Sequence, residues 1–239
     1  MVGTGILTNM AGIAAGGLLG TFCGRILTER FQKTLMAACA ISVIFMSAGS
    51  TLKEMLQIGA DGRLECIGIN MMLASMVIGA LAGEIINLED KMESFGRWLK
   101  MKTGSGSDAA FVDGFVTASL TVCVGAMAVI GSINDRLLGD PSVLFVKTVL
   151  DTVIVMIMAA TMGKGCIFSA LSVGIFQGGI FLLAGFLEPI MTEGALTNLS
   201  YVGNILIFCV GVNLLDLVHI RVANLMPGLI VAVAWSFWA

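Results

Sequence analysis

Four polar or small residues recur at a spacing of four within the apolar segment FVDGFVTASLTVCVG. They are Asp113, Thr117, Thr121 and Gly125. On a helix this spacing places a carboxylate, two hydroxyls and a gap along one face. A charged group near the centre of a membrane-spanning helix costs roughly 2.5–3.5 kcal/mol, so it normally faces protein or water. The pattern therefore indicates a polar lining for a charged solute or a proton.

A lysine and an aspartate stand four residues apart in the next apolar segment, FVKTVLD. On a helix Lys147 and Asp151 would share one face, where their side chains can form an ion pair. One interpretation is a structural salt bridge that holds a helix bundle together. The other is that both groups line a hydrophilic cavity in which a charged solute or a proton binds.

The run between these segments, GSINDRLLGDP, is polar where its neighbours are apolar. Ser132, Asn134 and Asp135 carry oxygens that suit a hard cation, whereas a helix beginning at Pro141 would favour an anion. A surface loop explains the run as a simple connection. A broken helix end explains it as part of a site, because an interrupted backbone within a membrane must line a cavity. Both interpretations stay open.

The composition indicates that these residues belong to an all-α polytopic membrane protein. Of the 239 residues, 57% are hydrophobic and only 12% are charged, and the mean hydropathy is +0.98. Ordinary soluble domains carry about 25% charged residues. A soluble protein of this size could not cover so much apolar surface. The small net charge of −3 gives no reason to expect a nucleic-acid partner.

Eight apolar stretches approach the length of about 20 residues that the hydrocarbon core requires. They cover residues 3–24, 35–56, 65–88, 110–131, 142–162, 166–187, 197–218 and 226–239. The last stretch is short, so we expect seven or eight transmembrane helices. The one long polar insertion runs from Leu88 to Ala109. We expect residues 1–239 to form a single transmembrane domain.

An internal repeat relates the two ends of the chain. A shift of 162 residues superposes like residues without a gap: Gly12 on Gly174, Gly16 on Gly178 and Glu54 on Asp216. The first expected helix then falls on the sixth, and such an odd shift reverses the direction through the membrane. We predict that 3–88 and 166–239 are inverted repeats around a central helix pair at 110–162, as in many secondary transporters.

Glycines spaced by four indicate close helix packing. The first helix carries Gly12, Gly16, Gly20 and Gly24, and the sixth carries Gly174 and Gly178. Small residues at this spacing let helices approach closely. One interpretation is packing within the bundle or between copies of the chain. The other is a seam along which the two repeats slide or rock.

The lysines and arginines predict an orientation. With the N-terminus outside, the inner loops hold nine of the 13 basic residues and the outer side holds four. Because basic residues concentrate on the cytoplasmic side, we expect the N-terminus to lie outside.

The central segment FVDGFVTASLTVCVGAMAVIGSINDRLLGDPSVLFVKTVLD, the opening GTGILTNMAGIAAGGLLG and the closing RVANLMPGLIVA carry a resemblance. They resemble the bacterial inner-membrane family catalogued as domain of unknown function 554, whose members are often labelled transport proteins. The resemblance covers essentially the whole chain. It implies a polytopic protein of the bacterial inner membrane and transfers no catalytic residue. An aspartate–glycine pair common in the family reads Asp135–Arg136 here.

Signatures of enzymes are absent from the sequence. His219 is the only histidine, and no P-loop, H-E-x-x-H or G-x-S-x-G motif occurs. The six cysteines form no C-x-x-C pair, so we expect neither a metal site nor a cofactor.

The function expected is secondary transport of a small polar or charged solute, coupled to H⁺ or Na⁺. A passive channel and a non-transporting scaffold subunit are the alternatives. The expected partners are the lipid bilayer and a small solute or ion, and association with further copies of the chain is open.

Overall fold

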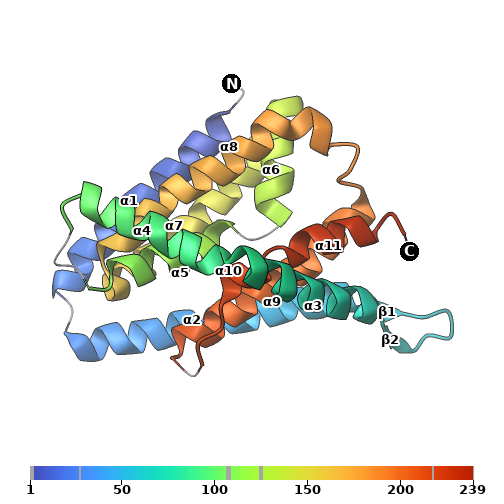
Figure 1. Ribbon diagram of the computed structural model, residues 1–239, viewed down its shortest axis with the longest axis horizontal. Coiled ribbons are helices and arrows are strands. Elements are labelled where there is room, and N and C mark those ends of the chain that lie inside the picture. The colour runs from blue at the N-terminus through green and yellow to red at the C-terminus, as the bar shows by residue number, and fades with distance from the viewer. Residues whose placement is uncertain (1–2, 27, 106–108, 124–125, 217, 239) are drawn as a thin grey trace.

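The computed structural model describes every residue except 1–2, 27, 106–108, 124–125, 217 and 239. The described part is almost entirely helical (Figure 1). Its helices are α1 (Thr4–Ile26), α2 (Glu29–Met55), α3 (Ile69–Ile86), α4 (Leu88–Lys102), α5 (Phe111–Cys123), α6 (Ala126–Leu137), α7 (Ser142–Met162), the 3₁₀ helix η1 (Lys164–Phe168), α8 (Ser169–Leu187), α9 (Glu193–Leu214), α10 (Val222–Leu225) and α11 (Gly228–Trp235). A short hairpin of β1 (Leu56–Ile58) and β2 (Leu64–Cys66) joins α2 to α3.

Six described helices are long and apolar enough to cross a membrane: α1, α2, α3, α7, α8 with its preceding η1, and α9. Helices α5 and α6 qualify only together, as a pair bent by 63° that forms either a broken span or a re-entrant loop. The fold is therefore that of an all-α polytopic membrane protein, as predicted. Helix α11 has 8 residues and a length of about 12 Å, so the eighth predicted stretch does not form a full span.

The predicted fourth span is not a single straight helix. Its first half is α5 and its second half belongs to α6, with residues 124–125 outside the described part. Helix α6 continues to Leu137, well beyond the expected end at residue 131. The reason is that its polar residues find partners inside the protein, so the helix need not stop where the sequence becomes polar.

The polar insertion after the third span contains the amphipathic helix α4, which the span pattern does not predict. Glu89, Gly96 and Leu99 form its buried face. Glu89 and Asp90 lie in the first turn and Lys100 and Lys102 in the last, which complements the helix dipole. Too few of its residues are apolar for a span, but one face is apolar enough to pack on the bundle.

Helix α5 forms the centre of the bundle. Ten of its thirteen residues are buried, so it has almost no face left for lipid. It contacts α4, α7, α8, α9 and η1. Phe111 and Phe115 are both fully buried, and Phe115 packs edge-on against Phe95 of α4. A helix enclosed in this way can carry polar groups, because they face protein instead of lipid.

The glycine face of α1 packs directly on α7. A Cβ atom at Gly16, Gly20 or Gly24 would collide with the backbone carbonyls of Thr152, Met156 and Ala160, respectively. A Cβ atom at Gly12 would meet the side chains of Thr148 and Thr152. The glycines therefore allow the two helices to touch backbone to backbone, which is the packing interpretation of this face.

Contacts agree with a two-fold relation between the ends of the chain but do not test it. Helix α1 contacts α8, α2 contacts α9, and α3 contacts α11. Figure 1 shows α1 and α8 crossing the molecule in opposite directions, as an odd shift requires. The two glycine faces differ, however: Gly174 lies against Met10, and Gly178 has open space around it. The superposition of the two repeats stays a prediction.

Candidate functional site

Lys147 and Asp151 form a buried ion pair on α7. The Lys147 Nζ atom lies 2.8 Å from Oδ1 and 2.7 Å from Oδ2 of Asp151. The two side chains are only 8% and 6% exposed. The pairing predicted from their spacing is therefore present. Because the two charges compensate each other, neither is left alone in the protein interior.

Two further groups extend this ion pair to neighbouring helices. Asn9 of α1 donates its Nδ2 hydrogen to Oδ2 of Asp151 at 3.1 Å. Lys147 donates to the backbone carbonyl of Val122 at 2.8 Å. Val122 is the penultimate residue of α5, where helix carbonyls lack intrahelical partners. Lys147 thereby connects α7 to the end of α5, at the point where the bent span turns toward α6.

The run Gly131–Asp135 lies inside α6, so it is neither a surface loop nor the helix break. Ser132 donates its hydroxyl to the Ala128 carbonyl at 2.7 Å. Asp135 accepts the backbone N–H groups of Gly3 and Gly5, at 2.9 and 3.0 Å. The surface-loop interpretation is therefore wrong for Gly131–Asp135, and only residues 138–141 connect α6 to α7. A role of Ser132, Asn134 and Asp135 in a binding site stays a prediction. The two helices of the bent pair meet before this run, since α5 ends at Cys123 and α6 begins at Ala126.

A cavity of about 360 Å³, here called the acidic cavity, opens beside the first half of α5. Its ionisable and hydroxyl lining comes from Glu89, Glu93, Asp113, Thr117, Asp216 and His219. No lysine or arginine occurs among the described residues that line it. The cavity therefore favours a cation or a proton over an anion.

A second cavity of about 370 Å³, the ion-pair cavity, lies on the other side of the end of α5. Its charged and hydroxyl lining comes from Ser50, Lys53, Glu54, Thr121, Lys147, Asp151 and Ser200. Two basic and two acidic side chains balance one another here. This cavity is polar without a net charge, in contrast to the acidic cavity.

The two cavities are separated by about one helical turn. On α5, Leu120 lines the acidic cavity and Thr121 lines the ion-pair cavity. On α9, the boundary falls between Val210 and Ile207. One turn of helix rises about 5.4 Å, so the barrier between the cavities is thin. The polar residues predicted to share one face of α5 are thus divided between the cavities. Asp113 and Thr117 line the acidic cavity, and Thr121 lines the ion-pair cavity.

The remaining predicted site residues lie away from both cavities or outside the described part. Asn134 lines a smaller hollow of about 180 Å³ between α6 and the segment that joins α8 to α9. Ser132 and Asp135 are buried and hydrogen-bonded within the protein. Gly125 lies outside the described residues. The structure therefore brings together Thr121, Lys147 and Asp151, and separately Asp113 and Thr117.

Several lining residues of the acidic cavity were not among the sequence candidates. Glu89 and Glu93 come from α4, and their spacing of four was a signal that the polar insertion forms a helix face. His219 and Asp216 follow α9 in the loop that leads to α10. No local pattern connects the residues of α4 with those that follow α9, because they meet only in the folded bundle. Asn9, which binds Asp151 and does not line this cavity, was also missed, because glycines dominate the pattern of its segment.

Glu89 is the most constrained of these carboxylates. Its Oε2 atom accepts the Ala223 backbone N–H at 2.9 Å, and its own N–H donates to Asn224 Oδ1 at 2.8 Å. Burial raises the pKa of the Glu89 carboxyl, although the Ala223 hydrogen bond and the nearby His219 oppose this change. A carboxyl with a raised pKa in a cavity of acidic groups is suited to holding a proton.

Comparisons with known proteins agree with the membrane fold. The model of a family described as "Protein of unknown function (DUF554)" matches residues 4–237. The "Uncharacterized membrane protein YdfK" of Bacillus subtilis is 26% identical over 227 residues, covering 95% of this chain and 93% of that protein. The "Uncharacterized protein YqgA" of Escherichia coli is 26% identical over 245 residues, covering 98% of each. No solved structure matches the chain.

Proposed function

We propose, from the premise that the chain belongs to the membrane-protein family DUF554, that it is a secondary transporter of a small polar solute. One observation carries the proposal: two polar cavities approach each other from opposite directions and are separated by one turn of α5. Such an arrangement suits alternating access, in which a solute site opens to one side of the membrane at a time.

The cavities lie at different levels along the same helices. Along α2, Met36 lines the acidic cavity and Ser50 the ion-pair cavity. Along α7, Met162 lines the acidic cavity and Leu150 the ion-pair cavity. The nearest lining residues are Met36 and Met46 on α2, which are 10 apart, and Ile154 and Met162 on α7, which are 8 apart. About 12–15 Å of these two helices therefore lies between the cavities, whereas on α5 and α9 the linings come within one turn. A path through the protein would therefore run along α2 and α7 and past the end of α5.

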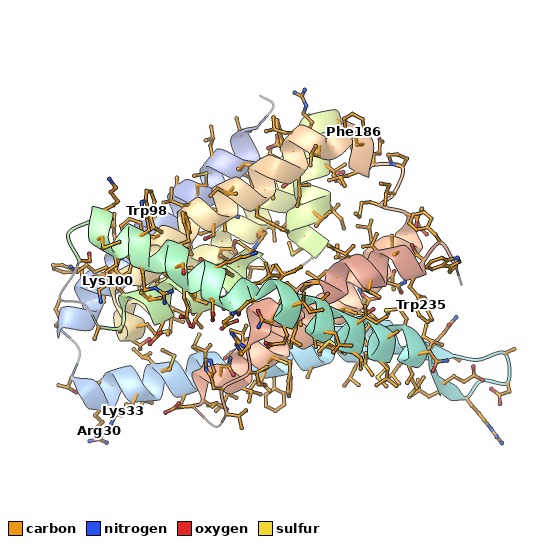
Figure 2. The ribbon with its side chains drawn as sticks, in the orientation of Figure 1. Arg30, Lys33, Trp98, Lys100, Phe186 and Trp235 are labelled. Atoms are coloured by element: carbon orange, nitrogen blue, oxygen red, sulfur yellow. The ribbon has the colours of Figure 1, made fainter. Side chains whose placement is uncertain are left out.

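The basic residues supply an orientation for this path. Figure 2 shows Arg30, Lys33 and Lys100 at one end of the molecule, and Trp235 lies toward the other. The acidic cavity lies near the basic end, because Met36 follows closely after Lys33 on α2. We assign this end to the cytoplasm of a bacterial cell and the N-terminus to the outside. The acidic cavity then faces inward and the ion-pair cavity outward.

Packing supports a division of the bundle into two bodies that could rock. Helices α1 and α7 interlock through the glycine face, and α2 packs along α9. Fewer contacts join α2 to α7, where both cavities lie. The acidic cavity, with the raised pKa of Glu89, offers a place for a coupling proton.

The alternatives are less consistent with these features. A passive channel needs a continuous polar path, but one turn of α5 closes this path at Leu120. A scaffold subunit needs neither cavity. It also has no use for a buried ion pair, whose insertion into the membrane costs free energy. The ion pair and the closed turn therefore favour transport.

Thiol accessibility tests alternating access without knowledge of the solute. Thr117→Cys and Thr121→Cys would each be made in a cysteine-free background and treated with a membrane-impermeant thiol reagent from either side. We expect Thr117→Cys to be labelled from the cytoplasm and Thr121→Cys from outside. Labelling of each should be incomplete after a short exposure, because each cavity is open in only part of the molecules at one time. Labelling of both from both sides at once would indicate a channel, and labelling of neither would indicate a scaffold.

A further inference from the structure

We propose that the ion-pair cavity binds a small α-amino acid in its zwitterionic form. The biological role rests on the proposed transport function, because the amino acid would be the solute that is carried. The binding chemistry follows from the cavity alone. Its volume of about 370 Å³ lies at the small end of the range of about 300–1,000 Å³ that is usual for ligand pockets. A solute of a few heavy atoms therefore fits this space.

Four helices bring polar side chains to this cavity. They are Ser50, Lys53 and Glu54 of α2, Thr121 of α5, Lys147 and Asp151 of α7, and Ser200 and Asn204 of α9. Apolar side chains such as those of Ile154 and Ile207 complete the wall. A ligand in the cavity can therefore meet polar groups on several sides.

The buried ion pair offers the ligand an acceptor and no donor. Lys147 uses its three N–H groups on the Val122 carbonyl and on the two carboxylate oxygens of Asp151. Asp151 also accepts a hydrogen bond from Asn9, so three of the roughly four acceptor positions of its carboxylate are in use. The remaining position can accept an N–H group of a ligand.

Glu54 supplies a second acceptor, and its carboxylate forms no hydrogen bond within the described part of the chain. Its side chain is only 20% exposed, and its one ion contact there is to Lys53, with Nζ and Oε1 3.9 Å apart. That distance is too long for a hydrogen bond, and the Lys53 side chain is 81% exposed. A largely buried carboxylate without a donor is costly, so a cationic N–H donor is the group that this wall lacks.

The balance of charge in the cavity calls for an anionic group on the same ligand. Two basic and two acidic side chains line the cavity, so a lone cation or a lone anion would leave an uncompensated charge in it. The ammonium of Lys53 and the hydroxyl of Ser50 can both donate to a carboxylate. A zwitterion brings both charges at once and preserves the balance.

The short distance between opposite charges in the lining favours an α-amino acid among zwitterions. Lys53 and Glu54 are neighbours on α2, with their charged atoms 3.9 Å apart. In an α-amino acid one carbon atom separates the ammonium from the carboxylate, so the two groups can meet Glu54 and Lys53 at the same time. A second N–H group of the ammonium is then available to Asp151, which lines the same cavity. An uncharged polar solute makes only neutral hydrogen bonds to the ligand side of these contacts and binds less tightly.

Four solutes of similar size separate the types of charge. L-Alanine carries both charges, propionate lacks the ammonium, isopropylammonium lacks the carboxylate, and lactamide is polar and uncharged. The variant Glu54→Gln keeps the size of the side chain and removes its charge. It should not lower the melting temperature, because Glu54 forms no hydrogen bond among the described residues. Glu65→Gln is the matched control, since Glu65 is exposed on β2 and lies outside the cavity lining.

Two measurements report binding and transport separately. In detergent, L-alanine should raise the melting temperature of the wild type by about 3–6 °C at ten times its dissociation constant, and the other three solutes should not. Proteoliposomes preloaded with unlabelled L-alanine should take up radiolabelled L-alanine by exchange. Glu54→Gln should raise the L-alanine concentration that gives half of each effect about 10- to 100-fold, because a charge-assisted hydrogen bond is lost. Glu65→Gln should leave both effects unchanged.

The other outcomes distinguish the amino-acid site from the transport function. A thermal shift by L-alanine that Glu54→Gln weakens, without exchange of any of the four solutes, would support the site and contradict transport. Exchange of propionate, isopropylammonium or lactamide but not of L-alanine would support transport and overturn the zwitterion site. An equal L-alanine shift in the wild type and in Glu54→Gln, or no shift in either, would also overturn the site.

Discussion

The carboxylate of Asp135 accepts the backbone N–H of Gly5 at 3.0 Å, although 130 residues separate them in the chain. A second bond, from the Gly3 N–H, uses the other carboxylate oxygen. Asp135 therefore caps the N-terminus of α1 from a neighbouring helix. The first N–H groups of a helix have no intrahelical partner, and a negative charge near them is favourable.

Removal of this charge should destabilise the bundle. We expect Asp135→Asn to lower the free energy of unfolding by about 1–2 kcal/mol, because an amide offers one acceptor and no charge to the helix end. Asp61→Asn is the control, since Asp61 accepts the Arg63 N–H in an exposed turn. Thermal unfolding in detergent would measure both. Equal stability of Asp135→Asn and wild type would mean that the cap does not contribute.

The ion pair on α7 should respond very differently to single and double substitution. Lys147→Met alone leaves Asp151 charged and buried, and we expect a loss of about 3–5 kcal/mol. Lys147→Met with Asp151→Leu removes both charges and should recover most of that stability. The double variant should still lose transport if the pair lines the solute path. Arg63→Met, which breaks an exposed pair, should leave stability unchanged.

The two glycine faces give a test with one substitution at two sites. In Gly20→Ala the new methyl group would collide with the Met156 carbonyl, and we expect a loss of about 1–3 kcal/mol. Gly178→Ala enters open space and should be neutral or slightly stabilising, because alanine favours the helix. Unfolding of the two variants under the same conditions measures the difference. Comparable losses would mean that α8 packs as tightly as α1.

Glu89 should make stability depend on pH. Burial raises its pKa in the folded protein above the value in the unfolded chain. Between these two values the folded state binds more protons, so stability should fall as pH rises through the range above the usual glutamate pKa. Glu89→Gln keeps an acceptor for the Ala223 N–H and cannot ionise. Unfolding of both forms from pH 4 to 8 should show a smaller slope for the variant, and equal slopes would exclude this role.

Local spacing was enough to predict some of the site. Lys147 and Asp151 lie on one helix and pair as their interval of four suggests. The glycine interval on α1 likewise predicts close helix packing, although it does not identify α7 as the partner. In both cases the pattern lies on a single helix face, so helical periodicity carries the information.

Other features could not be predicted from local patterns. Asp135 meets Gly5 across 130 residues, and Glu89 meets Ala223 across 134. These contacts exist only because the bundle brings distant helix ends together. Helix α4 was missed because it is too polar for a span, and the bend after Cys123 falls within an apolar run that reads as continuous. A buried amide that lacks a partner among the described residues, such as that of Gln177, can be recognised only when burial is known.

The most direct test of alternating access measures distances between α2 and α7 at both cavities. Spin labels at Met36 and Met162 report on the acidic cavity, and labels at Ser50 and Leu150 report on the ion-pair cavity. Double electron–electron resonance in proteoliposomes should give two distance populations for each pair. A change of pH, for example, should shift both distance distributions. If it enriches the longer distance between the labels at one cavity, it should enrich the shorter distance between the labels at the other. A single fixed distance in both pairs under all conditions would contradict alternating access.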